Sequence, residues 1–190
     1  MKIIGGQFKG RNFYMPEGIR PTQNVVRAAL FNLLGHDLDG VTFLELFAGS
    51  GAVGLEAFSR GASYVMMVER DAKCAHTIEE NITLVNTTGY KENRQRIDLK
   101  IKDAFVAIKE LAEQNAKFDI IFLDPPFRRG LTKKILKTLE AYDIVQPNCT
   151  VVVQHETSEN LPKSQGRFCL YKQHRYGGSY LSFYQPQTAV

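Results

Sequence analysis

The chain has 190 residues, of which 44% are hydrophobic and 23% charged, and its formal net charge is +4. This composition is typical of a globular domain with a sizeable core, and no apolar run is long enough to cross a membrane. The three cysteines, Cys74, Cys149 and Cys169, lie far apart, without the spacing of a zinc site or a redox motif. We therefore expect one domain of residues 1–190, reduced thiols, no metal, no signal peptide and a cytoplasmic protein.

The first 40 residues predict an appendage that precedes the main sheet. Short β-prone runs at residues 2–4 and 12–15 flank a glycine-containing stretch, which favours a hairpin or two loose strands with Arg11 exposed. Apolar residues at helical spacing then predict a helix over residues 23–34.

From residue 41 onward, predicted strands alternate with predicted helices. This order indicates βαβ crossovers and a mostly parallel sheet with helices on both faces. Near the end, apolar and polar residues alternate on both sides of Tyr176-Gly177-Gly178, which indicates an antiparallel hairpin. The pattern predicts a Rossmann-like α/β fold with seven strands in residues 41–190. The expected strands span 41–46, 64–68, 97–101, 119–123, 150–154, 167–175 and 179–184, and the expected helices span 52–60, 72–86, 104–114 and 131–141.

A glycine-rich turn follows the first of these strands. Gly49, Gly51 and Gly54 fit the pattern G-x-G-x-x-G between a predicted strand and a predicted helix. In that pattern the first glycine allows a tight turn, the second lets a ligand approach, and the third lets helix and strand pack closely. Glu69 ends the next predicted strand, where a carboxylate can accept hydrogen bonds from both hydroxyls of a ribose. Together these features predict a site for a nucleoside-containing ligand.

A second chemical motif, Asp124-Pro125-Pro126-Phe127, follows the strand predicted over residues 119–123. The two prolines remove backbone donors and stiffen the turn, which presents a carboxylate, carbonyl oxygens and an aromatic ring. Neighbouring acceptors suit the two donors of an –NH₂ group, and a ring can stack on a base. The motif therefore predicts binding of the exocyclic amine of a nucleobase. The alternative is a rigid loop in which Asp124 caps a helix and Phe127 belongs to the core.

These motifs resemble those of class I S-adenosylmethionine-dependent methyltransferases, and the two ends of the chain narrow the resemblance to the RsmD family. That family methylates the N2 amine of one guanine in bacterial small-subunit ribosomal RNA. The chain departs from the family at Gln23-Asn24-Val25, where an Asp-Arg pair is usual, which puts any contact of that pair in question. The general motifs are FAGSGAVG (47–54), VERD (68–71), KDAF (102–105) and DPPF (124–127), and the family-specific ones are IIGGQFKGR (3–11), RPT (20–22), VRAALFNLL (26–34) and YGGSYLSFY (176–184).

The resemblance implies S-adenosylmethionine as the cofactor. Glu69 is expected to hold its ribose and Arg70 to lie beside its adenine. Asp103 is expected to accept from the adenine amine while the Ala104 N–H bonds a ring nitrogen. Glu45, a charge on an otherwise apolar strand, is expected to orient the turn or to meet the methionine ammonium through water, with a purely structural acceptor role left open. The expected cofactor site comprises Glu45, Phe47, Ala48, Gly49, Ser50, Gly51, Glu69, Arg70, Asp103, Ala104 and Asp124, and the expected catalytic group comprises Asp124, Pro125, Pro126 and Phe127.

The distribution of charge adds a weaker indication of an RNA partner. Net charge is +2 over residues 1–40, −3 over residues 41–125 and +5 over residues 126–190. Basic ends that fold around one mouth would form a rim that attracts phosphates. The expected substrate is small-subunit ribosomal RNA, free or in an assembling small subunit. The expected RNA contacts are Arg11, Arg20, Thr22, Arg128, Arg129 and Arg175, with Arg27, Lys133 and Arg167 as further basic candidates.

Three other functions fit parts of the sequence. An adenine-N6 methyltransferase acting on DNA or RNA shares the motifs, but its tetrapeptide more often ends in Tyr or Trp than in Phe. An NAD-dependent oxidoreductase would use the glycine turn and Glu69 and would leave the DPPF motif without a role. A non-catalytic RNA-binding module would keep the fold, but an intact glycine turn together with Glu69 and Asp124 argues against loss of activity.

Overall fold

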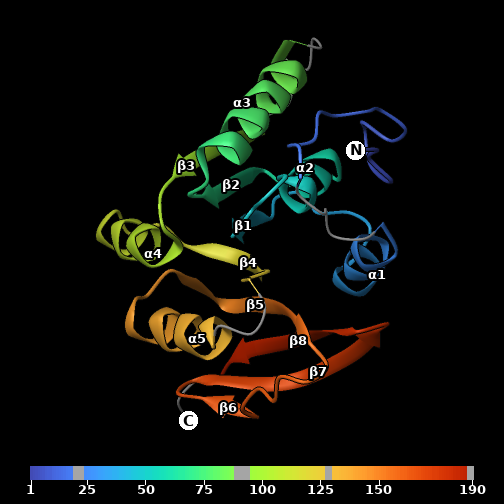
Figure 1. The fold of residues 1–190 in the computed structure, drawn as a ribbon. Helices are drawn as coiled ribbons and strands as arrows, with labels where there is room; N and C mark the ends of the chain where they lie inside the picture. The colour runs from blue at the N-terminus through green and yellow to red at the C-terminus, as the bar shows by residue number, and fades with distance from the viewer. Residues whose placement is uncertain (19–23, 88–94, 127–129, 188–190) are drawn as a thin grey trace.

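A mixed sheet forms the centre of the computed structural model, which describes residues 1–18, 24–87, 95–126 and 130–187 (Figure 1). The strand order is β3-β2-β1-β4-β5-β8-β7-β6. Neighbours from β3 to β5 pair in parallel, and β8, β7 and β6 extend the sheet by antiparallel pairing. The strands are β1 (Thr42–Leu46), β2 (Tyr64–Glu69), β3 (Arg96–Ile101), β4 (Phe118–Leu123), β5 (Val145–Glu156), β6 (Ser164–Gln165), β7 (Phe168–Tyr176) and β8 (Ser179–Pro186). The helices are α1 (Asn24–Leu34), α2 (Ala52–Ser59), α3 (Ala72–Thr87), α4 (Ala104–Glu113) and α5 (Leu131–Ala141).

The predicted α/β fold, with a mostly parallel sheet and a C-terminal antiparallel hairpin, is confirmed. Two differences concern strands. β5 begins at Val145, earlier than expected, and the two-residue strand β6 was not predicted. Gly166, with φ of 54°, makes the turn that brings β6 against β7 and so adds an eighth strand to the sheet in the described residues. A two-residue strand has too short a sequence pattern to be recognised by alternation.

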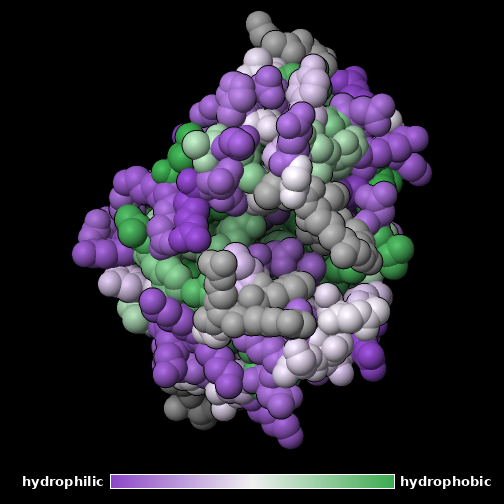
Figure 2. Space-filling view, in the orientation of Figure 1, coloured by the Kyte–Doolittle hydropathy of each residue, from purple (hydrophilic) through white to green (hydrophobic). Residues whose placement is uncertain are grey.

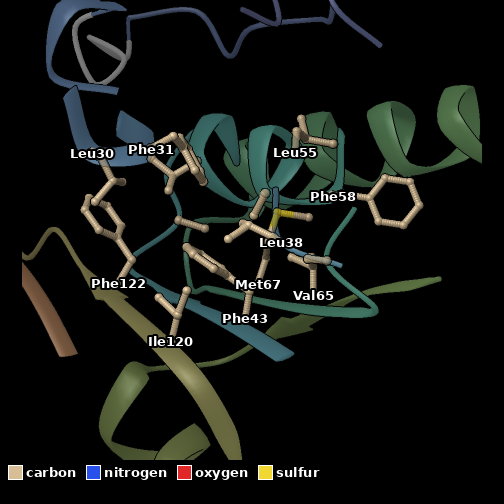
Figure 3. Packing of buried hydrophobic residues seen from close by; sticks show 14 of the residues in the cluster. Leu30, Phe31, Leu38, Phe43, Leu55, Phe58, Val65, Met67, Ile120 and Phe122 are labelled. Carbon is tan, nitrogen blue, oxygen red and sulfur yellow. The ribbon is translucent and has the colours of Figure 1, made fainter. Parts of the chain in front are cut away.

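Helices cover both faces of the sheet because its buried strands are apolar on both sides. Along β1, Phe43 belongs to one buried cluster and the next residue, Leu44, to the other. The first cluster lies beneath α1, α2 and α3, and the second lies beneath α4 and α5. Figure 3 shows part of the first cluster, where the rings of Phe31 and Phe43 stack with their centroids 6.3 Å apart. Each large side chain buried in this way contributes about 1.5–3 kcal/mol to folding.

The N-terminal segment is more than an appendage at the edge of the sheet. Ile3, Phe8 and Phe13 are buried members of the first cluster. The segment forms one antiparallel bridge, from Lys2 to Asn12, in place of a regular hairpin. It is held against the end of α2, where the Phe8 N–H donates to the Ser59 hydroxyl at 3.0 Å. Its apolar side chains therefore complete the core on the α2 face.

The third glycine of the turn motif allows helix α2 to lie close to the sheet, as predicted. A Cβ atom at Gly54 would lie 2.7 Å from both Glu45 Oε2 and Met67 Cγ. We expect Gly54→Ala to lower the free energy of unfolding by about 1–3 kcal/mol, because overpacking outweighs the helix propensity gained. Urea unfolding measures the change. Gly178→Ala is the control, since a Cβ there meets nothing within 4 Å; equal midpoints for the two variants would contradict this reading.

Candidate active site

The carboxyl ends of three neighbouring strands bring the motif residues together. Leu46 of β1 pairs with Val68 of β2 on one side and with Leu123 of β4 on the other. The residues that follow these partners, Phe47, Glu69 and Asp124, therefore leave the sheet at the same edge. This is the edge at which open α/β sheets bind their ligands.

A cleft of about 1130 Å³ lies at this edge, and Figure 2 shows a hollow near the middle of the face presented in Figure 1. Side chains alternate along each strand, so Glu45, Glu69 and Asp124 project on the same face of the sheet as the cluster beneath α1 and α2. The cleft is lined by Gly18, Val26, Glu45, Phe47, Ala48, Gly49, Ser50, Val68, Glu69, Arg70, Lys102, Asp103, Ala104, Phe105, Asp124, Pro125, Pro126, Leu131, Lys134, Gln154, Glu156, Tyr176, Gly178 and Ser179.

The first glycine of the motif allows a tight turn, as predicted, but the second does not have the role that the sequence suggested. Gly49 has φ of 55°, and a Cβ there would meet nothing within 4 Å, so this glycine leaves open space at the cleft. Gly51 has φ of 69°, and a Cβ there would lie 3.0 Å from Ile78 and 3.1 Å from Met67. Gly51 is also absent from the lining of the cleft. Its left-handed backbone and close packing require glycine, while the approach of a ligand is left to Gly49.

Phe47 leaves β1 in a conformation that side chains seldom adopt. Its φ is 62°, one of two positive values among the described residues other than glycine. The next residue is held in place, because the Ala48 N–H donates to the Val68 carbonyl at 3.0 Å. Strain of this kind typically persists where the surrounding structure enforces it at a functional site. This backbone conformation lets the Phe47 side chain pack against the second cluster while the residue lines the cleft.

The carboxylate of Glu69 accepts three backbone hydrogen bonds. The Gly49 N–H donates to Oε2 at 2.7 Å, and the N–H groups of Arg70 and Asp71 donate to Oε1, each at 2.8 Å. Glu69 thus ties the glycine turn to the end of β2, a task that the sequence did not predict. Oε1 already accepts two of these bonds, but Oε2 accepts only one, so Oε2 keeps a second lone pair for a ligand in the cleft that Glu69 lines.

Asp103 caps helix α4 at the other end of the cleft. Its Oδ1 accepts from the Phe105 N–H at 2.9 Å, and its Oδ2 lies 3.4 Å from the guanidinium of Arg70. Arg70 is largely exposed, with 62% of its side chain accessible, so this pair is weak. The ammonium of Lys134 lies 4.6 Å from the centroid of the Phe105 ring. Arg70, Asp103, Ala104 and Phe105 all line the cleft.

Glu45 is a buried carboxylate beneath the glycine turn. Its Oε2 accepts from the Gly54 N–H at 2.8 Å, which gives it the structural acceptor role that the sequence left open. Burial raises the pKa of Glu45 to about 8, and the charges of Asp124 and Glu69 add to the rise, while hydrogen bonds from Gly54 and Val53 oppose it. Glu45 is also among the residues that line the cleft.

The raised pKa of Glu45 predicts a pH-dependent stability. The folded pKa of about 8 exceeds the ordinary value of 4.5, so the stabilising contribution is complete below pH 4.5 and is lost as the pH rises through 8. Glu45→Gln keeps an acceptor oxygen and cannot ionise. We expect its unfolding free energy relative to the unsubstituted protein to rise by on the order of 3 kcal/mol between pH 5 and pH 8. Urea unfolding of both proteins across that range measures the difference, and a constant difference would contradict it.

The Asp-Pro-Pro turn lies in the same cleft as the glycine turn. Asp124 is half-buried, Pro125 is buried and Pro126 is exposed, and all three line the cleft with Gly49. The carboxylate of Asp124 is near enough to Glu45 to raise the pKa of that group. The structure therefore brings together the two motifs that the sequence assigned to one site. Phe127, the fourth residue of the motif, lies outside the described residues.

The predicted RNA contacts divide into three groups. Arg175 is exposed and next to Tyr176, which lines the cleft, but it is not itself a lining residue, and alternation along β7 turns the two side chains to opposite faces. Arg11 is exposed, but its guanidinium lies over Phe8, whose ring stacks on Phe58 at the end of α2 that points away from the cleft. Arg20, Thr22, Arg128 and Arg129 lie outside the described residues.

Among the further basic candidates, the assignment of Arg27 to phosphate contact was wrong. Its side chain is fully buried and lies 3.5 Å from Glu56. Arg167 pairs with Asp143 at 3.0 Å, before the start of β5 and so at the opposite edge of the sheet. Lys133 is exposed on α5. The sequence shows that a residue is basic, but it does not show whether the folded chain buries that side chain, pairs it with an acid or exposes it near the cleft.

Several cleft residues were not predicted. Lys102 and Lys134 add positive charge, and Phe105 adds a ring. Lys102 and Phe105 adjoin the predicted acid Asp103, so sequence proximity was an available signal for them. Nothing in the sequence marked Gln154 as a site residue, because it follows a run of apolar residues in a predicted core strand.

Within residues 1–18, 24–87, 95–126 and 130–187, histidine, cysteine and carboxylate side chains form no cluster of three or more that could hold a metal ion. In the same part of the chain, no helix combines the length and apolar character that a membrane span requires. Cys74, Cys149 and Cys169 are free thiols, the first two of them buried.

Comparison with known proteins shows which chains share this arrangement. Residues 1–185 match the family model described as conserved hypothetical protein 95. The ribosomal RNA small subunit methyltransferase D of Escherichia coli K12 is 31% identical over 190 residues, covering 99% of this chain and 91% of the relative. The protein of that name from Buchnera aphidicola (Acyrthosiphon pisum) is 32% identical over 174 residues, covering 90% and 85%. A solved Escherichia coli structure, described as a candidate methyltransferase, is 31% identical, covers 98% of each chain and has a TM-score of 0.82.

Proposed function

The chain belongs to the RsmD family, described as conserved hypothetical protein 95, and from that premise we propose that it methylates the N2 amine of a guanine in small-subunit ribosomal RNA with S-adenosylmethionine. The observation that carries the proposal is that Asp124 and the open turn at Gly49 line one cleft. The names of relatives over nearly the whole chain support ribosomal RNA as the substrate class. The choice of guanine N2 rests on the family resemblance and on the chemistry of the Asp-Pro-Pro turn.

The residues of the cleft fit a sulfonium nucleoside. The open space at Gly49, where a Cβ would meet nothing within 4 Å, admits a ligand against the backbone of the turn. Glu69 would hold ribose hydroxyls, while Asp103 and the Ala104 N–H would bind the adenine. The cleft of about 1130 Å³ exceeds the volume that one drug-sized ligand usually needs, which leaves room for a base beside the cofactor. S-adenosylmethionine, when bound, supplies a methyl group on sulfur that is open to in-line displacement.

The Asp-Pro-Pro turn would position the amine. Guanine N2 is a poor nucleophile because its lone pair is delocalised into the ring, so orientation and charge stabilisation must supply much of the rate. Asp124 and the Pro125 carbonyl would accept the two N–H groups of the amine and stabilise positive charge that develops on nitrogen. Asp124 also offers a carboxylate to which the released proton can pass.

The rim of the cleft would receive the RNA backbone. Lys102 and Lys134 line the cleft and would supply positive charge where a base enters, with the exposed Arg175 of β7 as a further candidate. Cations at such a rim attract phosphates in a salt-dependent way. A target base must leave its stack to reach Asp124, and the rim would hold the flanking nucleotides while it does so.

Two measurements test the proposal. Calorimetry with S-adenosylmethionine and with NAD separates a methyltransferase from an oxidoreductase, and we expect binding of the first alone. Labelled S-adenosylmethionine is then incubated with small subunits, or with small-subunit ribosomal RNA, from a strain that lacks the enzyme, and the modified nucleotide is mapped. We expect label at the N2 position of one guanine. Label on an adenine, or binding of NAD alone, would overturn the proposal.

A further inference from the structure

Gln154 is a buried polar residue of the cleft that none of the roles above uses. Its side chain is 7% exposed, yet it lines the cleft together with Asp124. Val153, the residue before it on β5, pairs with Leu123, the last residue of β4, so Gln154 lies beside Asp124, although β5 itself continues to Glu156. Alternation along β5 turns Gln154 to the same face as Val152, which belongs to the cluster beneath α1 and α2. Asp124 projects on that face too.

The amide oxygen of Gln154 is buried and has no hydrogen-bond partner within the described part of the chain. Its cross-strand neighbour on β8 is Leu181, which is apolar and cannot provide one. Buried polar atoms are ordinarily paired, because an unpaired one keeps the full cost of its desolvation. A half-turn about the terminal bond of the side chain exchanges the oxygen with the NH₂ group at almost unchanged shape. The amide can thus turn its oxygen toward a ligand in the cleft.

We propose that Gln154 determines base specificity by accepting a hydrogen bond from the ring N–H beside the amine held at Asp124. This inference rests on the proposed function. Guanine carries a ring N–H, at N1, directly next to its exocyclic N2 amine. An amide oxygen beside Asp124 therefore suits guanine, whereas a purine with a bare ring nitrogen at that position would face the oxygen with a lone pair. A site built to pair such a group rejects the analogue that lacks it.

The test uses a synthetic RNA fragment centred on the nucleotide that the mapping identifies. One version carries guanosine there, and the other carries 2-aminopurine, which keeps the amine but has no N–H at N1. We expect the unsubstituted enzyme to favour guanosine in kcat/KM by about 10- to 100-fold. In Gln154→Met this ratio should fall toward one, mainly through slower methylation of guanosine. Equilibrium affinities for the two fragments, measured by fluorescence anisotropy, give the same comparison without methyl transfer.

Two further variants complete the test. Gln146→Met changes a half-buried glutamine at the other end of β5 and is expected to keep the original ratio. Gln154→Glu keeps an acceptor oxygen and is expected to keep the preference for guanosine, so it tests the proposal even if Gln154→Met does not fold. An unchanged ratio in Gln154→Met, or a lost preference in Gln154→Glu, would overturn the role of Gln154. The proposed function is overturned separately, by a mapping experiment that places no label on the N2 position of a guanine, and this inference falls with it.

Discussion

Replacing Asp124 with alanine is expected to lower the single-turnover rate of RNA methylation by about 10²- to 10⁴-fold, while S-adenosylmethionine still binds. Asp124 lines the cleft beside the glycine turn, but the contacts assigned to the cofactor come mainly from the turn, Glu69 and Asp103. Loss of the Asp124 carboxylate removes the charged acceptor for the amine and leaves those contacts in place. The effect should therefore appear in the chemical step and not in cofactor affinity.

Rapid-quench methylation with labelled cofactor measures the rate of Asp124→Ala, and calorimetry measures its cofactor affinity. Asp124→Asn separates charge from shape, because it retains a carbonyl acceptor of similar size. Asp143→Ala is the matched control: this carboxylate is 65% exposed and pairs with Lys117 and Arg167 at the opposite edge of the sheet. We expect Asp143→Ala to remain fully active. A near-normal rate in Asp124→Ala would refute the assignment of Asp124 to the amine.

Replacing Glu56 with glutamine is expected to lower the free energy of unfolding by about 3–5 kcal/mol. Glu56 is fully buried in α2 and faces two arginines, with Arg60 Nη2 at 2.9 Å and Arg27 Nε at 3.5 Å. Its Oε2 also accepts from the Ile4 N–H at 3.0 Å, which ties the N-terminal segment to the helix. A glutamine keeps the shape but leaves two buried or nearly buried positive charges without their counter-charge.

Urea unfolding followed by circular dichroism measures the loss in Glu56→Gln. Glu113→Gln is the matched control, since Glu113 also pairs with a cation four residues away on a helix, but its side chain is 64% exposed. We expect that control to change the unfolding free energy by less than about 0.5 kcal/mol. Similar losses of unfolding free energy in the two variants would show that burial does not make the ion pairs of Glu56 more stabilising than an exposed pair.

Local patterns in the sequence predicted the elements well because those patterns act over short distances. Helix α5 was expected over residues 131–141 and spans Leu131–Ala141, and helix α3 was expected over residues 72–86 and spans Ala72–Thr87. The spacing of apolar residues decides such helices within a few turns. The same holds for Gly54, whose close contact with Glu45 follows from the strand-turn-helix pattern.

The candidate site was predictable where its residues stand at strand ends. Glu69 and Asp124 each end a buried parallel strand, and parallel strands bring their carboxyl ends to one edge. Gly51 shows the limit of this reasoning. A side chain at Gly51 would collide with Ile78, which belongs to α3 and lies far along the chain. The sequence of the turn alone could not predict this contact.

By itself, the sequence determined the order of strands and helices, the parallel sheet and the edge at which the motifs meet, since periodicity and the chemistry of glycine and proline operate between near neighbours. Only the tertiary structure decided which charges are buried and what they face. Arg27 was one basic residue among many until α2 was placed against it. Gln154 was a break in an apolar strand until β4 set it beside Asp124. The physical reason is that desolvation and pairing depend on contacts between residues distant in the chain, which no local pattern encodes.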